Sequence, residues 1–284
     1  MFSQHTQQYI NPHATFPISA QALFSSIWKN RYLILSMIKR EVIGRYRGSV
    51  LGIFWSFAHP LLMLCVYTFA FSVVFKARWG DEGETKVQFA VMLFTGLIVH
   101  GLFTEVVNRA PNLILSNINY VKKVVFPLEI FPIVALGSSL FHCAISVAIL
   151  LLTILLASGG IYWTIILFPF VLLPFAMLSL GIAWILASLG VFIRDIGQIV
   201  SILTTVLMFL SPVFYPLSAI PENYRPIIMA NPLTFIIEQA RAVLVFGKMP
   251  NWWGLLIYFC VASLVTWLGF AWFQKTRKGF ADVV

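Results

Sequence analysis

The side chains that could bind a metal ion or carry a proton lie within long apolar stretches of the sequence. The three cysteines are far apart and form no Cys-x-x-Cys pair, so packing explains them better than a metal site or a disulfide. Three of the five histidines lie in these stretches and could form a proton relay, but none of the three has a carboxylate beside it in the sequence, which favours hydrogen-bonded structural roles. These six residues are Cys65, Cys143, Cys260, His59, His100 and His142.

The carboxylates nearest to the apolar stretches lie at their edges, at Glu105, Glu129, Asp195 and Glu238. No pair of acidic residues lies inside a stretch where it could act as a general acid and base. The sequence also lacks a Gly-rich phosphate loop, a His-Glu-x-x-His motif and a Gly-x-Ser-x-Gly motif, so nothing in it predicts hydrolysis or group transfer. We therefore expect a protein that is not an enzyme and binds no metal.

The composition indicates where such a chain must fold. Of its 284 residues 60% are hydrophobic and 10% are charged, and the mean hydropathy is +0.90. A soluble domain of this size has about a quarter of its residues charged. The composition therefore excludes a soluble protein and predicts an all-α integral membrane protein. Membrane topology explains most of the net charge of +9, so we expect no nucleic-acid partner.

Uncharged stretches predict six membrane-spanning helices, because one crossing needs about 20 residues without a charge near the centre. The longest stretch runs from Ile130 to Ile193, and Ser158-Gly159-Gly160 divides it into two helices joined by a tight turn. The predicted spans are about 50–75, 87–108, 130–157, 161–191, 196–216 and 252–273.

The distribution of basic residues predicts the orientation. If the N-terminus is cytoplasmic, thirteen of the 19 Lys and Arg residues fall in inner segments, which predicts that both termini are cytoplasmic. The first 28 residues contain no Lys or Arg and no compact apolar run, unlike a cleavable signal peptide. We interpret residues 1–24 as a tail without an assigned role and residues 25–284 as one transmembrane domain.

Residues 25–47, before the first span, predict an amphipathic helix that lies in the plane of the lipid headgroups. Apolar residues gather on one arc and basic residues gather opposite. Docking on another protein surface is the alternative interpretation. The apolar arc contains Phe24, Ile27, Trp28, Ile34, Leu35, Ile38, Val42 and Tyr46.

The predicted cytoplasmic loop 109–129 contains enough apolar residues for a short helix that needs a surface to pack against, which indicates a docking element for a partner. The alternative is a simple loop whose Lys122 and Lys123 set the topology. The apolar residues are Leu113, Ile114, Leu115, Ile118 and Val121.

The outer segment 217–247 predicts short gate helices. Asn231-Pro232 is typical of a helix start, and the helix 233–246 that follows is too short to cross the membrane before it ends at Gly247. Glu238 and Arg241 are three residues apart and can pair on one face of this helix. Such a helix is re-entrant or interfacial, with a simple cap on the bundle as the alternative.

Three separated motifs resemble those of a known family. Over roughly residues 25–275 the chain resembles the membrane subunit of ATP-binding-cassette (ABC) exporters for lipid-linked polysaccharides such as O-antigen and teichoic acid. Capsule permeases, which export phospholipid-linked polymers, are similar but differ in the first motif. The matching residues are Ile38-Lys39-Arg40-Glu41, Arg45-Tyr46-Arg47-Gly48-Ser49-Val50-Leu51-Gly52, Trp55, Pro60-Leu61-Leu62-Met63, Val66-Tyr67-Thr68-Phe69, Val121 to Glu129, Asn231-Pro232-Leu233-Thr234, Glu238 and Arg241.

The resemblance implies an ABC-2-type membrane domain in the bacterial cytoplasmic (inner) membrane. It implies a homodimer with two copies of a separate ABC ATPase, which would hold ATP and magnesium, so that this chain itself needs no cofactor. It further implies outer gate helices that contain Pro232, Glu238 and Arg241, and a coupling helix in the loop 109–129. The residues expected to couple to the ATPase are Asn117, Asn119, Tyr120, Lys122 and Lys123.

The substrate implied by the resemblance is a polysaccharide linked to polyprenyl diphosphate. Aromatic rings offer flat apolar faces to sugars, so the first span suggests Trp55, Phe57, Tyr67 and Phe69 as a substrate path, although such residues also pack or face lipid. Arg45 and Arg47 could bind the lipid diphosphate or only set the topology. The alternatives are a capsule export permease, a polyprenyl-lipid glycosyltransferase or polymerase, and a passive channel or proton-coupled transporter.

Overall fold

The computed structural model describes residues 17–70, 86–122 and 126–283, and all regular structure in these residues is helical. Four helical stretches are long and apolar enough to span a membrane. They correspond to four of the six predicted spans, so the all-α membrane fold is confirmed. The four stretches are Val87–Asn112, Ile130–Ala157, Trp163–Phe192 and Trp252–Gly279.

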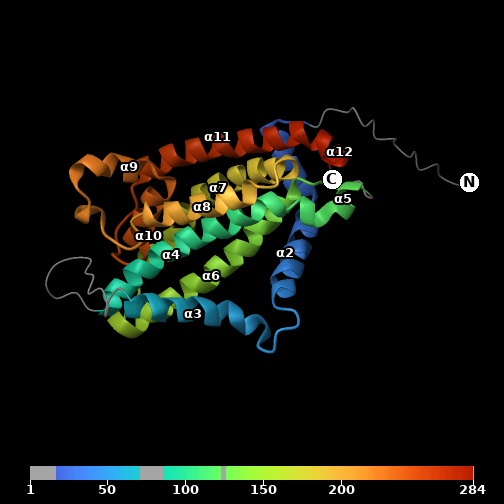
Figure 1. Cartoon of the computed structure of the whole chain (residues 1–284). Coiled ribbons are helices and arrows are strands. Elements are labelled where there is room, and N and C mark those ends of the chain that lie inside the picture. The colour runs from blue at the N-terminus through green and yellow to red at the C-terminus, as the bar shows by residue number, and fades with distance from the viewer. Residues whose placement is uncertain (1–16, 71–85, 123–125, 284) are drawn as a thin grey trace, which may run out of the picture.

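The long helices form a bundle, with α3 and α8 alongside them and other short helices at its two ends (Figure 1). α2, α5 and α12 lie at one end, whereas α9 and α10 lie at the other. The helices that define the fold are α1 (Ala20–Lys29), α2 (Arg31–Arg45), α3 (Trp55–Thr68), α4 (Lys86–Arg109), α5 (Ile118–Lys122), α6 (Ile130–Ser158), α7 (Phe168–Phe192), α8 (Ile196–Phe209), α9 (Arg225–Ala230), α10 (Pro232–Leu244), α11 (Trp252–Thr276) and α12 (Phe280–Val283).

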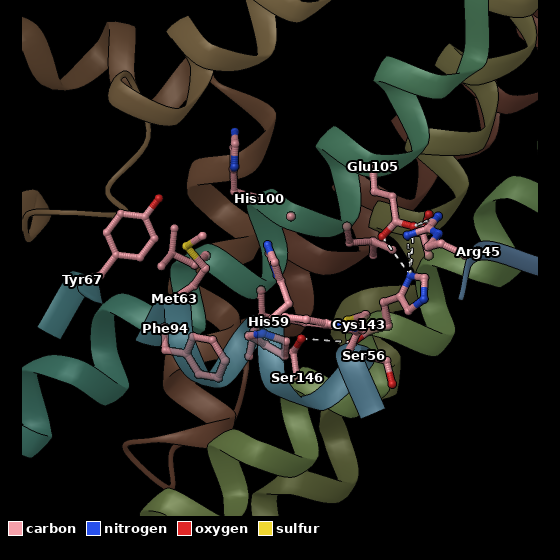
Figure 2. A pocket seen from close by; sticks show the side chains of 18 of the residues that line it. Arg45, Ser56, His59, Met63, Tyr67, Phe94, His100, Glu105, Cys143 and Ser146 are labelled. Atoms are coloured by element: carbon pink, nitrogen blue, oxygen red, sulfur yellow. Dashed lines mark hydrogen bonds and ion pairs between the residues drawn. The ribbon is translucent and has the colours of Figure 1, made fainter. Parts of the chain in front are cut away.

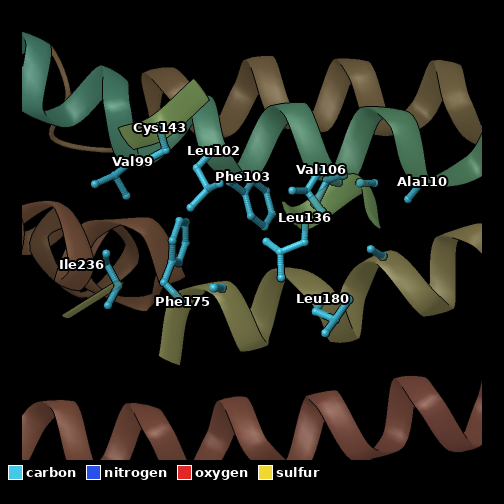
Figure 3. Close-up of a cluster of buried hydrophobic side chains, with 14 of the residues drawn as sticks. Val99, Leu102, Phe103, Val106, Ala110, Leu136, Cys143, Phe175, Leu180 and Ile236 are labelled. Carbon is cyan, nitrogen blue, oxygen red and sulfur yellow. The ribbon is translucent and has the colours of Figure 1, made fainter. Parts of the chain in front are cut away.

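Apolar side chains of α4, α6 and α7 form the centre of the bundle (Figure 3). The rings of Phe103 and Phe175 stack with their centroids 6.0 Å apart. Trp184 is fully buried and meets Phe270 of α11 edge to face at 5.5 Å. Such close interdigitation of large side chains holds the long helices in fixed positions relative to one another.

The remaining two predicted spans contain shorter helices within the described residues. The apolar helix Gly52–Thr68 and α8 are both shorter than the about 20 residues that a straight crossing needs. The first predicted span continues to residue 75, and residues 71–75 lie outside the described chain. The predicted end of the other at residue 216 is wrong, since α8 ends at Phe209. Pro212 cannot donate a helical hydrogen bond, and its ring clashes with the preceding turn.

The predicted single amphipathic helix 25–47 is in fact two helices, α1 and α2, which meet at Asn30. The side-chain amide of Asn30 donates to the Ser26 carbonyl oxygen at 2.8 Å. A side chain that bonds to the backbone in this way offers an alternative to helical hydrogen bonding, which favours an end of the helix at Asn30. α2 crosses the bundle instead of running along it (Figure 1) and packs on α6, where a side chain at Gly137 would overlap Ile38.

The two helices divide the predicted apolar arc. Ile34 and Val42 are buried against the bundle, as a docked apolar face requires. Three other members of the arc, Phe24, Trp28 and Leu35, are between 62% and 69% exposed, so the predicted contact of these residues with lipid stays a prediction. A change of axis at Asn30 turns side chains that share one side of a straight helix onto different surfaces.

The loop 109–129 is largely folded against the bundle. Leu113 and Ile114 are buried in it, so the predicted exposed apolar ridge is wrong for these two residues. Ile118 at the start of α5 is 38% exposed. The packing is close because α7 presents Gly190 to the backbone of Pro111.

Replacing Gly190 with alanine is expected to destabilise the chain by about 1–3 kcal/mol, the usual cost of overpacking. A Cβ atom at this position would overlap the Pro111 carbonyl oxygen, which is backbone and cannot turn aside. Thermal unfolding of the detergent-purified chain would measure the loss. Gly101→Ala is the matched control, since nothing lies within 4 Å of a Cβ added there. Equal melting temperatures for the two variants would contradict the prediction.

Candidate functional site: a polar cavity beside α3

A cavity of about 650 Å³ opens between α3, α4 and α6, with contributions from the end of α2 and from α8. One region of its wall is apolar and contains Met63, Phe94 and Leu97. Its polar lining includes the side chains of Arg45, Tyr46, His59, His100, Glu105 and His142, several of which are drawn in Figure 2. The cavity therefore combines apolar walls with a charged cluster.

Arg45 and Glu105, both labelled in Figure 2, form the charged cluster together with His142, although the three residues come from α2, α4 and α6. Arg45 Nη2 lies 2.6 Å from Glu105 Oε1, and His142 Nδ1 lies 3.0 Å from the same oxygen. Arg45 Nη1 also lies 3.1 Å from His142 Nδ1. A single carboxylate of α4 thus holds the end of α2 and joins it to α6.

The cluster extends to two further residues of the same helices. Arg109 Nη1 lies 3.9 Å from Glu105 Oε1, and Arg109 forms an ion pair with Glu41 of α2. These side chains are between 21% and 29% exposed. At such partial burial an ion pair is screened less than on the surface, and a network contributes more than an isolated pair.

Tyr46 completes the cluster from the loop between α2 and α3. Its hydroxyl lies 3.3 Å from His142 Nε2. Burial raises the pKa of the Tyr46 phenol above its ordinary value, and the neighbouring Arg45 only partly offsets that effect. The phenol therefore stays protonated at neutral pH and can donate to Nε2, which leaves Nδ1 to donate to Glu105.

The structure separates the predicted aromatic residues into two pairs. Trp55 and Tyr67 line the cavity. Phe57 and Phe69 are exposed by 45% and 62% and are outside the described lining. Of the two predicted arginines, Arg45 lines the cavity, whereas Arg47 is exposed beyond the end of α2.

The predicted coupling residues lie on both faces of the short helix α5 and the turn before it. Asn119 and Lys122 are exposed. Tyr120 instead faces the protein, with its ring centroid 4.6 Å from that of Phe126. Asn117 donates to the Leu113 carbonyl oxygen at 2.9 Å and holds the turn that precedes α5. Lys123 lies outside the described residues.

The predicted outer gate contains a buried ion pair. α9 and α10 are bent by 94° relative to each other, and Asn231 caps α10 by accepting from the Leu233 amide at 2.9 Å, as its sequence predicts. The predicted pair is confirmed, since Arg241 Nη1 lies 2.8 Å from Glu238 Oε1. The Pro232 carbonyl oxygen accepts from the Tyr258 hydroxyl of α11 at 3.1 Å.

Arg241 also binds the neighbouring elements directly. Its side chain is 1% exposed, with Nε donating to the Met92 carbonyl oxygen at 3.1 Å and Nη2 donating to the Val213 carbonyl oxygen at 3.3 Å. α10 is therefore anchored to α4 and to the turn after α8. α9 contributes exposed apolar side chains to this region, since Ile227 and Met229 are more than half exposed.

Sequence reasoning missed Glu105 and His142 as partners. They are 37 residues apart and belong to different predicted spans, and spacing along one helix gives no information on contacts between helices. One signal was present, because a carboxylate and a histidine within neighbouring spans are costly unless they are paired.

Comparison with known proteins gives a consistent result. A sequence model of the family described as "ABC-2 type transporter" matches residues 32–245. The O-antigen export system permease protein RfbA of Myxococcus xanthus is 29% identical over 264 residues, which cover 92% of this chain and 99% of that protein. An RfbA of Klebsiella pneumoniae is 26% identical, with 89% and 95% covered. The polysialic acid transport protein KpsM of Escherichia coli is 27% identical, with 86% and 92% covered.

Proposed function

This chain belongs to the ABC-2 type transporter family, as the non-catalytic permease of a polysaccharide exporter that works with ABC ATPase subunits, and we propose that it exports a polysaccharide linked to polyprenyl diphosphate, of the O-antigen type. The similarity to O-antigen permeases over almost the whole chain is the observation that carries the proposal. We place the exporter in the bacterial cytoplasmic membrane as a homodimer with two ATPase subunits.

The cavity beside α3 supports a role in accepting an amphiphilic substrate. Its apolar wall suits a lipid chain, and the aromatic rings of Trp55 and Tyr67 suit sugar residues. Arg45 borders the same space but shares its charge with Glu105. Arg47, which is exposed two residues later, would add the further positive charge that a diphosphate requires.

The ends of the bundle support the proposed orientation. α2, α5 and α12 lie at the same end, which we assign to the cytoplasm, and α9 and α10 lie at the outer end (Figure 1). The exposed side chains of Asn119 and Lys122 then face the ATPase. We propose six crossings, with α3 and α8 as parts of the first and the fifth.

A capsule export permease is the second candidate, because KpsM is 27% identical over 251 residues. The two candidates differ in the lipid that carries the polymer. Reconstituting the complex of this chain and its ATPase in vesicles loaded with either a polyprenyl-diphosphate-linked or a phospholipid-linked polymer would separate them. Transport of only the phospholipid-linked polymer would refute the proposed substrate.

Replacing Lys122 and Lys123 with glutamates is expected to uncouple the ATPase while membrane insertion is retained. Reversing two charges at an interface turns attraction into repulsion and weakens binding by about tenfold. Co-purification of the ATPase with the tagged chain would measure the loss, and Lys248→Glu on the outer side is the matched control. Unchanged export would remove the assignment of α5 as the coupling helix.

Replacing Trp55 and Tyr67 with alanine is expected to lower export by about tenfold, because a stacked aromatic ring contributes about 1 kcal/mol or more to binding. The matched control is Phe57→Ala with Phe69→Ala, which removes two aromatic rings outside the described lining of the cavity. Polymer at the cell surface is the measurement. A larger loss in the control pair would contradict a path through this cavity.

A further inference from the structure

Glu129 is a buried carboxylate at the end of the loop 109–129, directly before α6. Its side chain is 8% exposed, and both of its oxygens are engaged. Oε1 accepts from the Ser26 hydroxyl at 2.9 Å, and Oε2 accepts from Arg277 Nη1 at 2.7 Å. The Glu129 backbone carbonyl accepts from the Trp184 indole N–H at 3.0 Å. This one residue therefore binds α1, α7 and the segment that follows α11.

Arg277 makes a second bond to the same loop. Its Nη2 donates to the Phe126 carbonyl oxygen at 2.6 Å, so one guanidinium bridges two residues of the loop that are three positions apart. A guanidinium holds its donors in a fixed plane, and such a pairing fixes orientation as well as distance. The end of α11 and the end of the loop are thus joined by bonds that resist rotation.

The contacts of Glu129 with Ser26, Trp184 and Arg277 form a junction between helices. α5 reaches this junction through aromatic contacts. The Tyr120 ring lies 4.6 Å from the Phe126 ring and 5.8 Å from the Phe131 ring, measured between centroids. Phe126 and Phe131 stack at 5.2 Å and lie on either side of Glu129 in the sequence. α5 also packs against α12. A displacement of α5 therefore acts on Phe126 and Phe131, which lie three residues before and two residues after Glu129.

We propose that Glu129 is the positioning residue that makes α5, α1 and the end of α11 move together. The inference rests on the proposed function, in which the ATPase moves α5. Networks of hydrogen bonds, ion pairs and packed side chains can carry coupling between separate elements, and removing a member of such a network changes the coupling. Glu129 is such a member, because its carboxylate is the group that Ser26 and Arg277 both bind.

The first test is the amount of polymer exported per ATP hydrolysed by the full complex in its native host membrane. Glu129→Gln keeps the shape of the side chain but removes the charge that pairs with Arg277, and we expect it to lower this ratio about tenfold while the amount of bound ATPase is unchanged. Ser26→Ala removes only the bond to α1 and should lower the ratio less. Asp195→Asn is the control, because Asp195 is an exposed carboxylate.

The second test measures the coupling itself on the full-length chain without its ATPase. Spin labels at the exposed positions Phe24 on α1 and Ser116 before α5, in a variant without Cys65, Cys143 and Cys260, report the distance between the two elements. We expect one narrow distance distribution with Glu129 present and a distribution at least twice as broad in the Glu129→Gln and Ser26→Ala variants.

The outcomes of these tests separate the junction from the proposed function. Equal distance distributions in all variants would overturn the junction, as would an unchanged ratio of export to ATP hydrolysis in both Glu129→Gln and Ser26→Ala. A native complex that exports no polymer would instead overturn the proposed function, and the distance measurement would still decide whether Glu129 joins α1 to the loop.

Discussion

Replacing Glu238 with alanine is expected to destabilise the protein by about 3–5 kcal/mol, the usual cost of leaving a buried charge without its partner. The Arg241 guanidinium is 1% exposed, and Glu238 is the carboxylate that lies 2.8 Å from it. The backbone oxygens of Met92 and Val213, which also bind this cation, carry only partial charge and replace the lost carboxylate only in part. Size-exclusion chromatography after heating in detergent would measure the loss of stability as a loss of the monodisperse peak.

The double variant Glu238→Gln with Arg241→Met is the informative companion. It removes both charges and keeps most of the side-chain volume. The double variant should therefore lose less folding stability than Glu238→Ala alone, although it changes two residues. Glu222→Ala is the control, since Glu222 is 89% exposed and lies 3.7 Å from Arg225. A double variant less stable than the single one would show that the charge pair itself stabilises α10.

Replacing Glu105 with alanine is expected to lower export by more than a hundredfold. Glu105 holds Arg45 and His142 together and lies close to Arg109. Without Glu105 these groups have lost their shared anion at the edge of the cavity. Breaking such a charge pair costs about 3 kcal/mol, which corresponds to a factor of more than a hundred in an equilibrium constant. Polymer at the cell surface is the measurement.

The position of α2 distinguishes this explanation from simple unfolding. Loss of Glu105 should release the end of α2 from α4 and α6, so limited proteolysis should cut near Arg45 and Arg47 faster in the variant while the bundle stays intact. Glu105→Gln should give an intermediate result, because an amide oxygen still accepts hydrogen bonds but carries no charge. Equal cleavage rates in the native chain and in Glu105→Ala would contradict the role of Glu105 in holding α2.

The features of the fold that follow from hydrophobic length and local capping were predictable from the sequence. Four long spans, the start of α10 at Asn231 and the pairing of Glu238 with Arg241 all depend on residues close together in the chain. The errors have one local and one tertiary cause. Asn30 divides the amphipathic segment, and the bundle buries Ile114, which an isolated loop would expose.

The candidate site was predictable only in part. Arg45, Trp55 and Tyr67 lie in a motif that the sequence already singled out, and all three line the cavity. Glu105 and His142 come from other helices, and the axial rotation of two packed helices decides whether their side chains meet. Residue spacing gives no information on that rotation, so the charged cluster emerged only from the structure.

The sharp bend between α9 and α10 has a topological consequence. α9 and α10 lie at the end of the bundle opposite to α12 (Figure 1), and their 94° bend lets the chain turn back before α11 begins. A re-entrant segment that returns to the side from which it entered does not add a membrane crossing. On the proposed topology we therefore expect that residues can be inserted into or deleted from this pair without inverting α11 or moving the C-terminus to the opposite side of the membrane.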